Sequence, residues 1–84
     1  MFQFTKEQIL NKRSEVRTDL VNILARDIDN ELSSWLQKER EGMVTNQVTV
    51  KIPPALEGLP EEIREALETA GFSCKDEGGI LTIW

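Results

Sequence analysis

Few side chains in this sequence are suited to catalysis. The 84 residues include no histidine and no tyrosine, and Cys74 is the single cysteine. Ser–His and Cys–His nucleophilic pairs and the common histidine-containing zinc sites are therefore excluded. One cysteine also excludes an intrachain disulfide and a thiolate metal cluster. Because Cys74 alternates in phase with Phe72 in a strand-like segment, we expect it to be a small buried core residue.

Carboxylates are the other candidates for chemistry. The segment DIDNE holds Asp27, Asp29 and Glu31 and superficially resembles a calcium-binding loop. An EF-hand loop requires glycine at its sixth position, where this chain has Leu32, and it also requires a closing glutamate. On a helix these carboxylates point in different directions. We therefore interpret them as a solvated helix face.

Two further carboxylate pairs have simple structural roles. Glu61–Glu62 begins a predicted helix, where acidic side chains favour the helix dipole, and Asp76–Glu77 lies in a predicted turn. Gly78–Gly79 lacks the pattern of a phosphate-binding or dinucleotide-binding loop. The sequence therefore predicts no catalytic residue, no metal ligand and no cofactor. The alternative is a hydrolase or nuclease that uses acidic residues and a divalent metal.

The length and net charge of the chain limit the kinds of partner that it is expected to bind. The chain is long enough for one small domain with a marginal core. Its net charge is −5, and phosphate-backbone binding needs a basic surface, so we expect no nucleic-acid partner. Apolar runs are far shorter than the ~20 residues that span a bilayer, and the N-terminus does not resemble a signal peptide. We expect a soluble protein with no membrane partner, made in the cytoplasm.

The first half of the chain predicts one long helix. Thr5 and Gln8 form a candidate capping box, and no proline or glycine follows before Gly42. A helix of about 36 residues would be ~54 Å long. Its apolar residues form a stripe that winds around the helix, and the polar segment Asn11–Glu15 interrupts it. Either the helix bends near Arg26–Asn30 or its two halves face different partners.

The second half predicts a small sheet and a second helix. Residues 47–52 alternate as a half-buried strand, which Pro53 and Pro54 end. The helix falls within ALEGLPEEIREALETAG, with Pro60 at its first position, and Gly71 suits the left-handed position after its end. The predicted core contains Val50, Leu67, Phe72 and Ile83.

The last residues predict a hairpin. Residues 72–75 and 80–84 read as strands joined by a turn at residues 76–79. A right-handed crossover places the first two strands parallel, so the terminal strand lies between them, antiparallel to both. Trp84 is then expected to cover one end of the core.

These elements define the fold class. We predict an α+β fold, with a long N-terminal amphipathic helix followed by a small βαββ unit that has a three-stranded, mainly antiparallel sheet. The organisation is residues 1–42 as a helical docking arm and residues 43–84 as the βαββ domain. The alternative is a single compact unit made from both segments.

The helix carries more apolar surface than this sheet can cover. The stripe extends about 40 Å, whereas strands of this kind are about 17–20 Å long. We predict that the surplus binds further copies of the chain or a larger protein; the alternative is that the helix breaks and folds back. The predicted interaction residues are Leu20, Ile23, Leu24, Ile28, Leu32 and Trp35.

The stretch LPEEIREALETAGFSCKDEGGILTIW resembles the C-terminal part of small phage-encoded proteins. The residues that carry the resemblance are Leu67, Ala70, Gly71, Phe72, Gly78, Gly79, Ile83 and Trp84. The stretch is 26 of the 84 residues. The resemblance implies a non-enzymatic phage product, located in the virion or the host cytoplasm. We favour a self-associating structural component; the alternative is an acidic accessory protein or inhibitor that binds a host protein.

Overall fold

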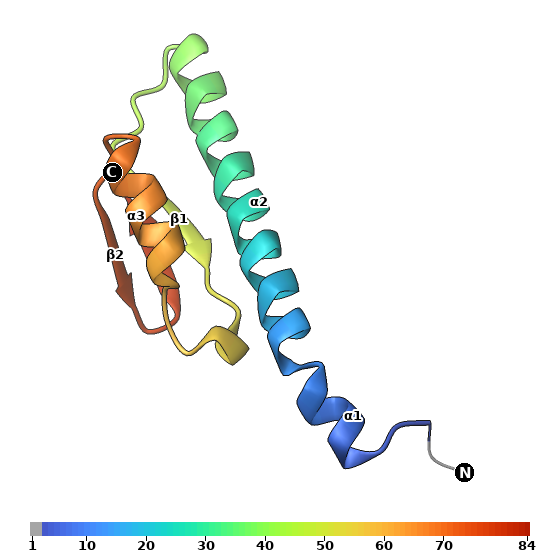
Figure 1. The fold of residues 1–84 in the computed structure, drawn as a ribbon. Helices are drawn as coiled ribbons and strands as arrows, with labels where there is room; N and C mark the ends of the chain where they lie inside the picture. The colour runs from blue at the N-terminus through green and yellow to red at the C-terminus, as the bar shows by residue number, and fades with distance from the viewer. Residues whose placement is uncertain (1–2) are drawn as a thin grey trace.

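The computed structural model in Figure 1 describes residues 3–84. The first two residues of the predicted 1–42 segment lie outside this range. The long helix α2 runs along one side of a small unit that contains the sheet and helix α3, and α1 extends beyond it. The elements in chain order are α1 (Lys6–Asn11), α2 (Arg13–Arg40), β1 (Val48–Lys51), the 3-10 helix η1 (Pro54–Leu56), α3 (Glu61–Thr69), β2 (Cys74–Glu77) and β3 (Ile80–Ile83).

The predicted single helix is in fact two helices. The capping box is present, because the Thr5 hydroxyl accepts the N–H of Gln8 at 3.2 Å and the Gln8 side chain accepts the N–H of Thr5 at 3.0 Å. The helix then breaks at Lys12, whose ψ is −1° and whose N–H donates to the carbonyl of Ile9. This break lies in the polar segment Asn11–Glu15. No residue of α1 is buried, so packing does not hold α1 in line with α2.

The bend that was considered near Arg26–Asn30 does not occur. Helix α2 is continuous from Arg13 to Arg40, and the buried residues Leu24 and Ile28 lie on either side of Arg26. They bury the middle of α2 against the sheet, while its first turns are exposed. The alternative expectation, that the two halves of the helix face different partners, stays a prediction.

The second helix begins at Glu61, one residue after its predicted first position, and a separate short turn precedes it. Pro54–Leu56 forms a 3-10 turn that ends at Glu57, a residue with a left-handed φ of 55°. Pro60 precedes the first turn of α3, and its carbonyl accepts the N–H groups of Ile63 and Arg64. The chain cannot continue as one helix through this segment because Pro60 has no N–H to donate.

Helix α3 ends as predicted. Gly71 has a φ of 93°, and its N–H donates to the carbonyl of Glu68 at 3.0 Å. The N–H of Phe72 donates to the carbonyl of Leu67 at 2.9 Å, which completes a Schellman motif. This stop turns the chain from α3 directly into the hairpin.

The C-terminal strand is central, as predicted. The sheet order is β1-β3-β2, and both neighbouring pairs are antiparallel. The backbone of Trp84 also exchanges two hydrogen bonds with Ser73, so the chain end is paired. The side chain of Trp84 does not cover the core, however, and is 49% exposed. Side chains alternate along a strand, so Trp84 lies on the face opposite to the buried Ile83.

The hairpin turn is shorter than predicted. Asp76 and Glu77 belong to β2 and pair with Leu81 and Ile80, so only Gly78–Gly79 forms the turn. Both glycines have positive φ, 59° and 78°, as a two-residue type I′ turn requires. Pairing with β3 keeps both acidic residues in the strand, although aspartate and glutamate are depleted in strands.

Both helices pack on one face of the sheet. The core is formed by α2, α3 and the helix-facing side chains of β1 and β3, together with Ile52, which follows β1. Its buried residues are Leu24, Ile28, Val48, Val50, Ile52, Ile63, Leu67, Leu81 and Ile83. Of the predicted core set, Phe72 is only partly buried against this cluster. Residues from the 1–42 and 43–84 segments therefore share one core.

The molecule is elongated because α1 and the first turns of α2 extend past this core. Its extents are 58 × 23 × 22 Å, and its radius of gyration is 16.1 Å. A compact domain of this length has a radius of gyration of about 12 Å. The difference reflects an N-terminal segment with few tertiary contacts.

Candidate interaction surface

The structure divides the six predicted interaction residues between core and surface. Leu24 is 0% exposed and Ile28 is 4% exposed, and both pack against the sheet of the same chain. Leu32 and Trp35 are partly buried against the same core, and Leu20 is half-buried. Ile23 is exposed. Much of the predicted stripe is therefore covered within the monomer.

The remaining apolar surface lies closer to the N-terminus. We define the N-terminal arm as residues 3–17, which comprise α1, Lys12 and the first turn of α2. Each of its larger apolar side chains is roughly half exposed, and these are Phe4, Ile9, Leu10 and Val16. Phe4 and Leu10 were missed as candidate residues. The signal that could have found them is the polar segment 11–15, which separates this apolar group from the part of the helix that meets the sheet.

Part of the N-terminal arm lies over a shallow groove beside η1. Ile9, Val16 and Leu20 line this groove from the helical side, and Ala55 and Glu57 line it from the η1 side. These contacts are open to solvent, since Ile9, Val16 and Ala55 are all exposed. The groove therefore leaves this apolar face accessible to another molecule.

An ion pair marks the junction between the arm and the folded body. An Nη of Arg17 lies 3.1 Å from a carboxylate oxygen of Glu62 in the first turn of α3. The pKa of Glu62 is lowered by the hydrogen bond from its own backbone N–H and then by Arg17. Both side chains are about half exposed, so this pair contributes little to stability. The pair links α2 to the first turn of α3.

A second apolar surface lies between the two packed helices. We call it the α2–α3 groove; its lining includes Ala25, Ile28 and Leu32 of α2, and Ile63, Ala66 and Ala70 of α3. Ala66 and Ala70 are exposed because alanine is too short to close the space between the helices. The groove is thus shallow, apolar and open along α3.

Aromatic residues extend the α2–α3 groove toward the C-terminal end of α2. The ring centroids of Trp35 and Phe72 are 6.2 Å apart and the rings are inclined by 49°. The Trp35 indole N–H donates to Glu39 at 3.3 Å, and Leu36 beside it is exposed. Trp35, Leu36, Leu32 and Phe72 line a further apolar hollow here.

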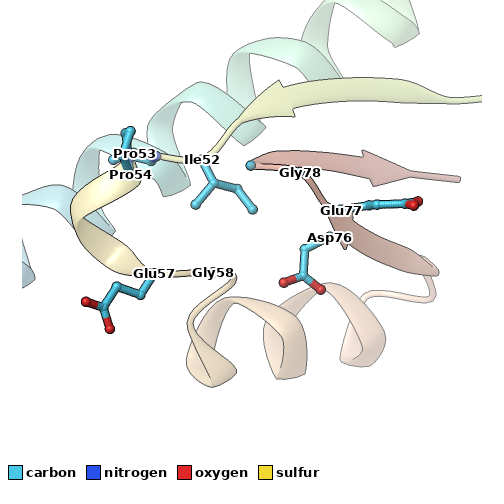
Figure 2. Close-up of a pocket in the computed structure, with 9 residues that line it drawn as sticks. Ile52, Pro53, Pro54, Glu57, Gly58, Asp76, Glu77 and Gly78 are labelled. Atoms are coloured by element: carbon cyan, nitrogen blue, oxygen red, sulfur yellow. The ribbon is translucent and has the colours of Figure 1, made fainter.

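The cleft at the turn end of the sheet, shown in Figure 2, does not assemble a catalytic cluster. It is lined by Pro53, Gly58 and the hairpin turn together with three acidic residues, and the carboxylates of Glu57, Asp76 and Glu77 point in different directions. Asp76 accepts the N–H of Leu59 at 3.3 Å and an N–H of Arg64 at 3.0 Å. Its pKa is lowered, chiefly by the Leu59 N–H. This carboxylate therefore has a structural role, because it connects β2 to Arg64 of α3 and to the loop before α3.

Cys74 and the acidic residues of α2 are the remaining polar candidates from the sequence. Cys74 is half-buried, with its Sγ 3.9 Å from an Nη of Arg64, and burial raises the pKa of its thiol. Asp27, Asp29 and Glu31 lie along α2. Among residues 3–84, no group of three or more cysteine or carboxylate side chains is arranged to hold a metal ion.

No protein-family model, no curated protein and no solved structure matches this chain. Within the described part of the chain, none of the helices has both the length and the apolar character needed to cross a membrane.

Proposed function

We propose that this chain is a non-enzymatic protein–protein interaction module that associates with further copies of itself through its N-terminal arm. The observation that supports this most directly is the exposure of Phe4, Ile9, Leu10 and Val16 on the N-terminal arm, outside the folded core. Apolar groups concentrated on one projecting segment are typical of an interaction site.

The expected association is weak for a single contact. Complete burial of such a side chain contributes roughly 1.5–3 kcal/mol, so covering the exposed half of four contributes about 3–6 kcal/mol. The surface that covers them loses a similar apolar area, so the total of about 6–12 kcal/mol is comparable with the ~4–15 kcal/mol that association costs. We expect micromolar or weaker binding for one arm, which becomes effective when many identical contacts form together.

Repeated weak contacts suit a structural component, and we extend the proposal to a phage virion protein on the basis of the resemblance given above. The second candidate is an acidic accessory protein or inhibitor that binds a host protein in the cytoplasm. The net charge of −5 favours that candidate, because an acidic body complements a basic partner surface.

Light scattering on the purified chain tests the self-association. The average mass of the wild type should rise with concentration, over a range of about 1 µM to about 1 mM. Leu10→Glu places a charge on the apolar face and should raise the dissociation constant at least about tenfold, a change of ~1.4 kcal/mol. The matched control is Asn11→Glu, which adds the same charge at the neighbouring polar position and should leave the mass unchanged.

Two results would contradict the proposal. A wild type that stays monomeric throughout this range would exclude self-association and favour the host-directed candidate. Equal effects of Leu10→Glu and Asn11→Glu would show that net charge, and not the apolar face of the arm, controls the assembly.

A further inference from the structure

The N-terminal arm and the folded body differ in charge. The arm contains four of the ten basic residues of the chain and two of its fifteen acidic residues. Its cations include Lys6, Lys12 and Arg13, none of which forms an ion pair within the described residues. The arm therefore combines exposed apolar side chains with a net positive charge.

The α2–α3 groove has the complementary character. Helix α3 carries Glu61, Glu62, Glu65 and Glu68 against the single cation Arg64; Glu61 pairs with Arg64 and Glu62 with Arg17, which leaves Glu65 and Glu68. Asp29 of α2 also lines the groove and is exposed. An apolar groove with an acidic border is the type of site that binds a basic amphipathic helix, which places its apolar face between the two flanking helices.

We propose that the N-terminal arm of one copy binds in the α2–α3 groove of a second copy. This inference rests on the proposed self-association and identifies the two surfaces that meet. The apolar side chains Phe4 and Leu10 would cover Ala66 and Ala70, and the cations near Lys12 would approach the carboxylates of α3.

The arm of the same chain cannot occupy this groove while α2 is intact. Arg13 and Ala25 are twelve residues apart on one continuous helix, which corresponds to about 18 Å. Figure 1 shows α1 continuing away from α3 at the end of α2. Folding back would require unwinding the first turns of α2, whereas an arm from another copy needs no rearrangement.

The two surfaces are different, so the contact is heterologous. Each copy would use its arm on one neighbour and its groove on another, and such contacts produce closed rings or open filaments instead of dimers alone. This distinguishes the proposal from pairing of two arms, which would stop at a symmetric dimer. Paired arms would also bring like charges together.

Mixing two defective variants tests this arrangement. Leu10→Glu damages the arm and leaves the groove intact. Ala66→Arg puts a bulky cation in the groove at an exposed helical position and leaves the arm intact. We expect each variant alone to be monomeric by light scattering at a concentration where the wild type is assembled. A one-to-one mixture should form a heterodimer and no larger species, since only one good arm and one good groove remain.

Controls separate folding from binding. Circular dichroism should be the same for both variants and the wild type; if Ala66→Arg is unfolded, Asp29→Arg replaces it as the groove variant. Thr49→Arg adds the same cation on the exposed face of the sheet and should leave assembly unchanged.

The failures of the two proposals are distinguishable. A wild type that is monomeric at every concentration overturns both. Leu10→Glu could abolish assembly while the folded groove variants still assemble, or while the mixture stays monomeric. Either result overturns the groove assignment and leaves self-association through the arm standing.

Discussion

The carboxylate of Asp76 lies 3.0 Å from the guanidinium of Arg64, and this pair joins the edge strand β2 to α3. Asp76 aligns in the sheet with Leu81 and Val50, so it belongs to the helix-facing row of side chains. At the edge of the sheet this row meets solvent, and Arg64 covers the acidic group there. The same carboxylate accepts the N–H of Leu59 at 3.3 Å, so it also holds the loop before α3.

Asp76→Ala should lower the melting temperature, because it removes both of these contacts at once. Glu77→Ala is the matched control, since Glu77 is on the exposed face and pairs only with the exposed Lys75. Thermal unfolding followed by circular dichroism should show a clear loss for Asp76→Ala and almost none for Glu77→Ala. Equal melting temperatures for the two variants would mean that Asp76 does not hold the loop and α3 together.

Stability should decline in acid. The folded-state pKa of Asp76 lies below its ordinary value of 3.8, and that of Glu62 lies below 4.5. A lowered pKa stabilises the folded state above the ordinary value, and this stabilisation is lost as the pH falls through the folded-state pKa. Urea unfolding at about pH 6 and about pH 3 should show the loss, and Asp76→Asn should lose less over the same interval. An identical decline in both proteins would exclude Asp76 as a source.

Neighbouring residues on α2 should respond very differently to truncation. Leu24 is completely buried, so Leu24→Ala should lower the free energy of unfolding by about 2–5 kcal/mol. Ile23 is exposed, and Ile23→Ala should change it by about 0.5 kcal/mol or less. Chemical denaturation at low protein concentration measures both. Similar losses would show that α2 packs on the sheet through a different face.

The left-handed stop of α3 should tolerate asparagine better than valine. Gly71→Val should lower the free energy of unfolding by more than ~1 kcal/mol, because a β-branched residue is strained at this φ. There is open space around the position, so a clash does not contribute. Gly71→Asn is the control and should lose less, since asparagine adopts this conformation more readily. Denaturation curves that place valine at or above asparagine would exclude backbone strain as the cause.

Local pattern was sufficient for much of the fold. The capping box at Thr5, the glycine stop after α3 and the alternation in β1 each depend on residues close together in sequence, and all three are observed. The central position of β3 also followed from connection rules, because few sheet topologies are compatible with a short crossover and a hairpin. These features depend on backbone geometry that neighbouring residues control.

The local sequence pattern gave wrong predictions at two places in the chain. Asp76 looked like a turn residue, but pairing with Leu81 and the charge of Arg64 keep it in a strand. The break at Lys12 could not be located from helix propensity, because no proline or glycine marks it.

The interaction surface shows the same division. The sequence determined by itself that the long helix carries more apolar side chains than a small sheet can cover. Only the tertiary structure decided which of them remain exposed. Leu24 and Ile28 face the sheet and are buried, whereas Leu10 and Val16 lie beyond it. The physical reason is that periodicity defines the face of a helix, but burial depends on how far along that helix the opposing layer extends.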